Sequence, residues 1–100
     1  MTNEELDLRI ARLVGLGVYK DKINGNWYCM KGGTINNPIP KYSTNWNDLM
    51  PLVVEHRINF YRDTKGRFCA YTKKDINAYN NNPQRALAEC LLKVLEAKDE

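Results

Sequence analysis

Aromatic and basic side chains are interleaved on a predicted β-hairpin in the second half of the chain. Two tyrosines and two arginines lie on its strands and a lysine follows them; the five residues are Tyr61, Arg62, Arg67, Tyr71 and Lys73. Aromatic rings beside guanidinium groups can stack on nucleobases and pair with phosphates. This hairpin is therefore the first candidate site for an anionic ligand.

The alternation of side chains along a strand decides whether these residues share a face. Tyr61, Arg67 and Tyr71 have the opposite parity to Phe60 and Phe68. If the phenylalanines face the core, the two tyrosines and Arg67 lie together on the other face. In a sheet covered by helices on both sides, the same tyrosines pack under a helix with their hydroxyl groups at the edge. The sequence leaves both arrangements open.

A second candidate for anion binding is the start of the middle helix. Ser43 and Thr44 supply hydroxyl groups there, next to backbone amides that a helix leaves without partners. Such an end can hold a phosphate. The alternative is that these side chains serve only as helix caps.

The residue types that catalysis requires are few and scattered. His56 is the only histidine, and it falls at the expected C-terminal end of the middle helix, where a cation is favourable. Cys29, Cys69 and Cys90 form no CxxC pair, which predicts reduced thiols that pack as small apolar groups. The sequence has no glycine-rich phosphate loop and no carboxylate cluster. We therefore expect no catalytic residue, no metal and no cofactor.

Capped amphipathic segments predict the first and last helices. The first begins after Thr2, which forms a capping box with Glu5, and it ends at Gly15. The last begins with Pro83 behind an Asn82 cap, where the missing proline amide does no harm.

The middle helix is less regular because it contains Pro51. A proline beyond the first turn removes a hydrogen bond and costs about 3 kcal/mol. Ser43, Thr44 and Asn45 are three consecutive good N-cap residues before this helix. The helix is either kinked behind a Thr44 cap, which we favour, or it starts later from Asn47.

Two stretches have the composition of β-hairpins. Residues 58–72 alternate about a glycine-containing turn, and residues 18–31 do so less regularly about an Asn-Gly-Asn turn. Residues 32–40 are predicted to be a loop and residues 75–82 a connector. The element order is α-ββ-α-ββ-α, in a single domain spanning residues 1–100. This predicts an α/β (α+β) fold with a small antiparallel or mixed sheet sandwiched by three helices.

Three segments resemble the phage ABA sandwich domain, a family of small proteins encoded mostly by bacteriophages and prophages. They are IARLVG (10–15), PKYSTNWN (40–47) and NPQRALAECLL (82–92), and together they span nearly the whole chain in the family's order. The chain departs from the family at three points: no tryptophan follows Gly15, Pro51 interrupts the middle helix, and Glu89 and Cys90 stand where small residues are usual. The resemblance implies a sheet between helices and a phage origin, but no activity.

The net charge is +3, and the lysines and arginines concentrate in residues 57–74. A basic region of this kind attracts anionic partners, although solvated hairpin ends have the same composition. No signal peptide or membrane span is recognisable, so we expect the protein in the host bacterial cytoplasm, without a membrane partner.

The leading hypothesis is a non-enzymatic phage accessory protein that binds an anionic ligand or a host factor. It would counter host defence by sequestering a nucleotide immune signal. We expect a homo-oligomer, because two small protomers can enclose a ligand that one cannot. The alternatives are a nucleic-acid-binding protein, which the small net charge makes weaker, and an interaction module acting on a host defence protein.

Overall fold

The structure, a computed structural model, describes residues 1–98. Along the chain it contains α1 (Asn3–Leu13), β1 (Gly17–Lys20), β2 (Trp27–Lys31), β3 (Thr34–Pro38), α2 (Trp46–Glu55), β4 (Asn59–Arg62), β5 (Phe68–Tyr71), β6 (Asn77–Asn80) and α3 (Pro83–Lys98). The predicted α+β class and the element order are confirmed, with one extra strand after each hairpin. We call β1–β3 the N-terminal sheet and β4–β6 the C-terminal sheet; each is an antiparallel meander with its strands in chain order.

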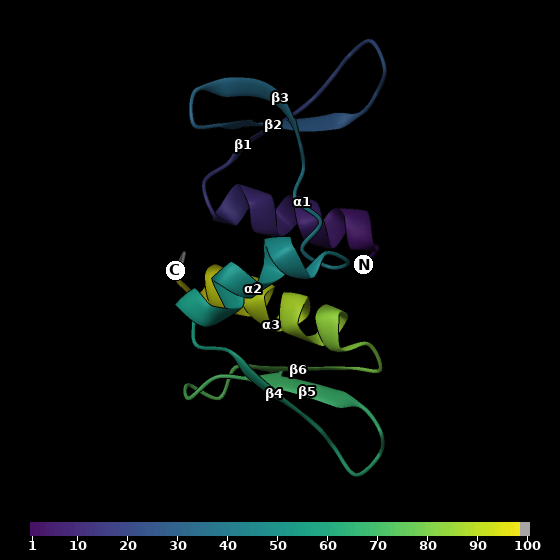
Figure 1. Cartoon of the computed structure of the whole chain (residues 1–100), viewed down its shortest axis with the longest axis vertical. Helices are drawn as coiled ribbons and strands as arrows, with labels where there is room; N and C mark the ends of the chain where they lie inside the picture. Colours follow the sequence, from purple (N-terminus) through teal and green to yellow (C-terminus); the bar gives the residue numbers. More distant parts are fainter. Residues whose placement is uncertain (99–100) are drawn as a thin grey trace.

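The layers differ from the predicted single sheet between helices. Figure 1 shows the helices in the middle layer, with one sheet at each end of the molecule. The reason lies in α3, whose buried residues cover most of its circumference: Ala86, Leu87, Ala88, Cys90, Leu91, Leu92, Val94 and Leu95. A helix that is apolar on most sides must be covered on most sides. It packs on α1 and α2 on one side and on β5 and β6 on the other.

The third strand of each sheet was not predicted. β3 lies in the stretch expected to be a loop, and β6 lies in the expected connector. Both strands are rich in asparagine, which has low strand propensity, so pairing with a neighbouring strand decides their conformation. The Nζ of Lys93 on α3 donates a hydrogen bond to the carbonyl of Asn77 at 2.7 Å, which covers part of the outer edge of β6.

The helix starts agree with the sequence at both ends of the chain and differ in the middle. Thr2 Oγ1 accepts from the Glu5 amide at 3.1 Å, and Asn82 Oδ1 accepts from the Arg85 amide at 3.2 Å. The cap of α2 is Asn45, so both predicted caps, Thr44 and Asn47, are wrong. Pro51 lies inside α2 and does not start it.

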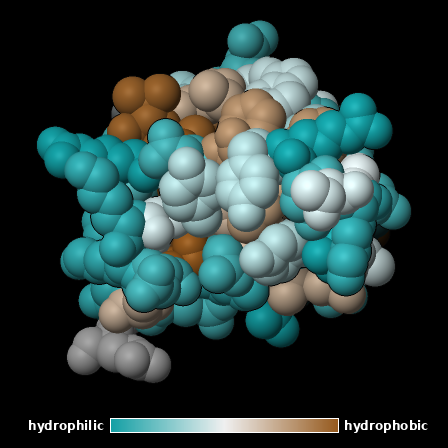
Figure 2. All heavy atoms as spheres, turned by 90° about the horizontal axis from the view of Figure 1, so that it is seen from below, coloured by the Kyte–Doolittle hydropathy of each residue, from teal (hydrophilic) through white to brown (hydrophobic). Residues whose placement is uncertain are grey.

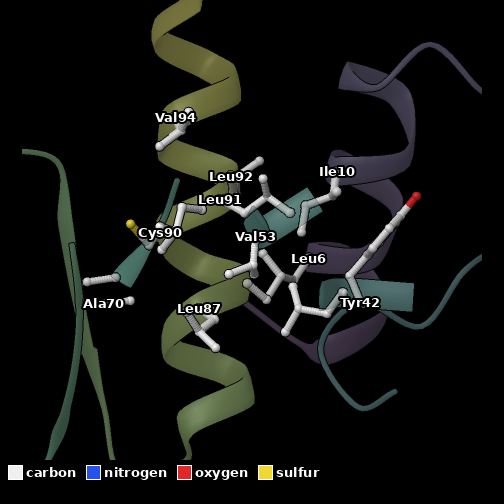
Figure 3. Close-up of a cluster of buried hydrophobic side chains, with 14 of the residues drawn as sticks. Leu6, Ile10, Tyr42, Val53, Ala70, Leu87, Cys90, Leu91, Leu92 and Val94 are labelled. Carbon is white, nitrogen blue, oxygen red and sulfur yellow. The ribbon is translucent and has the colours of Figure 1, made fainter. Parts of the chain in front are cut away.

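The core lies between the three helices and extends to the C-terminal sheet. Leu6 and Ile10 of α1, Val53 of α2 and Leu92 of α3 point toward one another in Figure 3, and Ala70 of β5 lies on the far side of α3. The three cysteines are unpaired and buried, as predicted. Within residues 1–98, no helix is both long enough and apolar enough to cross a membrane.

Candidate ligand-binding surface

The register of the C-terminal sheet brings its tyrosines together on one face. Tyr61 of β4, Cys69 of β5 and Tyr79 of β6 lie side by side in one row. The next row, two residues further along each strand, is Asn59, Tyr71 and Asn77. Because directly opposed residues and residues two apart point to the same side of a sheet, all six side chains share a face. We call it the tyrosine face.

The tyrosine face is open to solvent. Tyr61, Tyr71 and Tyr79 are 50%, 39% and 45% exposed, whereas Cys69 between them is 2% exposed. Figure 2, seen from the side of this sheet, shows pale ring-bearing side chains gathered at the centre with hydrophilic groups around them. The tyrosines therefore do not pack under a helix. α3 covers the opposite face of the sheet, where the small residues Ala70 and Ala78 are buried.

Contacts within the face hold its rings in place. The ring centres of Tyr61 and Tyr71 are 5.6 Å apart with an edge-to-face angle of 66°. The guanidinium of Arg67 lies 4.9 Å from the centre of the Tyr79 ring. Contact with the Cys69 thiol raises the pKa of Tyr61 and of Tyr79 above the ordinary tyrosine value.

Arg67 is positioned by Asp63, which lies at the same end of the sheet. Its Nε and one terminal nitrogen both lie 3.1 Å from Asp63 Oδ2. Desolvation acts to raise the pKa of Asp63, but hydrogen bonds from the Arg67 and Lys65 amides lower it below its usual value. The Arg67 guanidinium therefore serves as a fixed part of the stacking surface rather than as a mobile cation.

The other two basic candidates of the hairpin lie off this face. Arg62 stands in one row with Phe68 and Asn80, whose side chains point to the α3 side of the sheet. Lys73 follows β5 in the turn to β6. It lines a separate hollow of about 330 Å³, which also reaches Asn59.

Ser43 and Thr44 lie at the start of α2, away from the C-terminal sheet. The Ser43 amide donates to Asp7 Oδ1 at 2.8 Å, and the Thr44 amide donates to the Lys41 carbonyl at 3.1 Å. Burial raises the pKa of Asp7, although the bond from Ser43 opposes this shift. The hollow beside Thr44 contains Glu4 and Asp7. These amides already have partners, and the carboxyl groups nearby disfavour a phosphate.

Tyr79 and Asn77 were missed by the sequence analysis, whereas Asn59 has the strand parity predicted to place it with Tyr61 and Tyr71. The turns that flank β5 have matching geometry. In the first, the Asp63 amide donates to the Arg67 carbonyl at 2.7 Å, and in the second the Thr72 amide donates to the Ile76 carbonyl at 2.9 Å. The fourth residue of each turn, Gly66 and Asp75, has a positive φ of 81° and 62°. The second turn thus has the same backbone geometry as the first, and it returns the chain from β5 into β6.

Within the described residues 1–98, His56 contacts no side chain suited to act as its nucleophile. Its Nδ1 lies 3.1 Å from Lys98 Nζ, and its Nε2 lies 4.0 Å from Glu55 Oε2. As predicted, it stands at the C-terminal cap of α2. Within the described residues, no group of three or more histidine, cysteine, aspartate or glutamate side chains is placed to hold a metal ion.

Comparisons with known proteins assign no role to the tyrosine face. No protein-family model matches the chain, and no curated protein matches its sequence.

Proposed function

We propose that this protein is a non-enzymatic binding protein that takes a nucleotide-type ligand on the tyrosine face. The observation that carries the proposal is the presence of three tyrosines, each 39–50% exposed, on one uncovered sheet face. Scattered apolar side chains are normal on a protein surface, but a grouped set of exposed aromatic rings marks a binding site.

Stacking and charge both suit a nucleotide. A base stacked on an aromatic side chain contributes about 1–3 kcal/mol, and every base has a face that can stack. Exposed basic side chains surround the sheet, namely Arg62, Lys65, Lys73 and Lys74. They give the region a positive potential that favours the approach of an anion.

Binding without turnover amounts to sequestration. In a phage accessory protein in the bacterial cytoplasm, this activity would lower the concentration of a host nucleotide signal and so blunt an antiviral defence. The layer order differs from the one that the phage family resemblance implies. The proposal therefore depends on the tyrosine face and not on the resemblance.

Isothermal titration with a panel of mononucleotides, cyclic nucleotides and short single-stranded oligonucleotides tests the proposal. Tyr61→Ala should weaken binding about tenfold or more, because one stacking partner is lost. Tyr61→Phe keeps the ring and should bind within about threefold of the unaltered protein. Trp46→Ala, at an aromatic residue 40% exposed on α2, is the matched control.

Two results would count against nucleotide binding at this face. One is unchanged affinity of the Tyr61→Ala variant, and the other is no binding anywhere in the panel. Oligonucleotide binding with a steep fall as salt increases would instead favour the nucleic-acid alternative, through counterion release.

Self-association through β4 is a second candidate function for this region. Within residues 1–98, β4 pairs on one side only, and all of its residues are exposed. Phe60 is 45% exposed and borders an open hollow of about 540 Å³ with Met50 and Val53. An unprotected edge strand with an apolar side chain is a template for another strand. The occupant we infer is a second copy of this chain, paired antiparallel along β4.

Sedimentation velocity over a range of protein concentrations tests this pairing. The unaltered chain should form dimers, and Phe60→Lys should be monomeric because it places a charge at the edge. Ile23→Lys, at a residue 96% exposed in the N-terminal sheet's turn, should leave the dimers intact. A monomeric unaltered chain at every concentration would refute the pairing.

A further inference from the structure

A hollow with a strongly basic lining lies where α2, α3 and the C-terminal sheet meet. It encloses about 330 Å³. Its apolar lining comes from Ile76 and the buried Val94, and His56 also lines it. Small-molecule sites in proteins begin at about this size, roughly 300 Å³.

Four cations and one acid line this hollow: Arg57, Lys73, Lys74 and Lys98 against Glu55. Within residues 1–98, no ion pair joins Arg57, Lys73 or Lys74 to an acidic side chain. Lys98 lies in the last turn of α3, where a cation complements the helix dipole. That explanation does not extend to Lys73 and Lys74, which lie in a turn between strands.

Arg57 occupies a backbone position that favours glycine. It follows α2 with a φ of 55°, and the Ile58 amide donates to the Val53 carbonyl at 3.0 Å. α1 ends in the same pattern, with Gly15 at a φ of 92° in the matching place. An arginine in the left-handed conformation is strained relative to glycine. Strain at a residue that lines a basic hollow is the pattern expected of a functional position.

The hollow adjoins the tyrosine face. Asn59 lines the hollow and stands beside Tyr71 in the register of the sheet. Lys73 lies two residues beyond Tyr71 in the turn to β6, so their Cα atoms are at most about 7 Å apart. Asn59 and Tyr71 therefore lie at the border between the tyrosine face and the basic hollow.

We propose that this hollow binds phosphate groups, as the phosphate subsite of the nucleotide whose base stacks on the tyrosine face. The link between this phosphate subsite and a base on the tyrosine face rests on the proposed function. The affinity of the hollow for phosphate does not depend on it. Lysine and arginine donors bind the phosphate oxygens through charge-assisted hydrogen bonds, and the apolar lining from Ile76 and Val94 limits competition from water.

Three probes separate the two parts of the site: pyrophosphate, adenosine and ADP. His56 is the only histidine of the chain, so its ring signals report on the hollow in NMR titrations without assignment ambiguity. Burial and then Lys98 lower the pKa of His56, while Glu55 opposes them. Bound pyrophosphate should raise that pKa, because it offsets the positive charge of Lys98, Arg57, Lys73 and Lys74.

Variants with matched charge changes complete the experiment. Lys73→Ala with Lys74→Ala should weaken pyrophosphate binding about tenfold or more, since two charge-assisted contacts are lost. Lys22→Ala with Lys31→Ala removes the same charge from exposed positions in the N-terminal sheet and should change it less than about threefold. Arg57→Gly should weaken binding yet raise the midpoint of thermal unfolding, because it removes backbone strain.

The outcomes distinguish the two proposals. Pyrophosphate binding with a shift of the His56 signals supports the hollow, even if adenosine does not bind and the proposed function fails. Adenosine binding at the tyrosine face with no response of His56 to pyrophosphate or ADP overturns the hollow as a phosphate subsite. Equal losses in the two double-lysine variants overturn it as well, because general electrostatics would then explain the affinity.

Discussion

Both sheets are antiparallel meanders of three strands, yet they are attached to the helices in different ways. The C-terminal sheet lies along α3 through β5 and β6, with Ala70 and Ala78 buried at the contact. The N-terminal sheet reaches the helices mainly through β1, which contacts α1. Cys29 is the one buried residue among its strands.

The difference shows how one sheet can present a binding face. Small residues on the inner side of the C-terminal sheet allow α3 to approach closely, so the sheet is fixed without cover on its other side. Its outer face is then free to carry exposed tyrosines. The N-terminal sheet has no comparable apolar side, and its aromatic residues serve to attach it, as when Arg12 stacks 5.3 Å from the centre of Trp27.

The largest effect is expected from Leu91→Ala. Leu91 is fully buried in α3, between the other helices and the C-terminal sheet. The lost contacts and the cavity should lower the free energy of unfolding by about 2–5 kcal/mol in chemical denaturation. Ile23→Ala, at an exposed residue, should change it by less than about 0.5 kcal/mol. Two separate unfolding transitions in the Leu91 variant would show that the sheets unfold independently.

Ala70→Leu tests the close approach of α3 to the C-terminal sheet. Ala70 is fully buried, so a larger side chain must separate the two elements, at a cost of about 1–3 kcal/mol. Ala97→Leu adds the same group at an exposed position of α3 and should be close to neutral. An equally stable Ala70 variant would mean that the packing here is loose.

Trp27→Ala should affect only the N-terminal sheet. The variant loses the stacking of Arg12 and of Lys20, whose Nζ lies 5.8 Å from the ring centre. Each exposed contact of this type contributes about 0.5–1 kcal/mol. Hydrogen exchange should become faster at amides of β1–β3 and stay unchanged at β4–β6. Faster exchange in both sheets would contradict their separate attachment.

The smallest effect is expected from Asp7→Asn, and it depends on pH. Because burial raises the pKa of Asp7 in the fold above its unfolded value of 3.8, ionisation costs more in the folded state. The stability that the protonated group contributes is complete below the unfolded pKa and is lost as pH rises through the folded pKa. Asparagine keeps an acceptor for the Ser43 amide and carries no charge. The stability of the variant relative to the unaltered chain should therefore be greater at pH 7 than at pH 3. Thermal unfolding of both proteins at pH 3 and pH 7 measures this difference in stability. If the advantage of the variant were smaller at pH 7 than at pH 3, the direction of the Asp7 pKa shift would be wrong.

Much of the local structure could be predicted from the sequence. The capping residues Thr2 and Asn82, the glycine after α1 and the alternation about Gly66 specify local hydrogen bonds or backbone angles, which depend on neighbouring residues in the chain. The parity that separates Tyr61 from Phe60 follows in the same way from the geometry of a strand. These features fixed the element order and the membership of two of the three tyrosines in one face.

Tertiary structure decided the third strand of each sheet, the order of the layers and the exposure of the tyrosines. β3 and β6 are strands because a neighbouring strand offers hydrogen bonds, and this pairing outweighs the weak propensity of their asparagines. The helices form the middle layer because α3 is apolar on most sides, and only packing shows which elements cover it. For the same reason, the exposure of the tyrosines and the basic hollow around Lys73 and Arg57 depend on contacts between residues far apart in the chain.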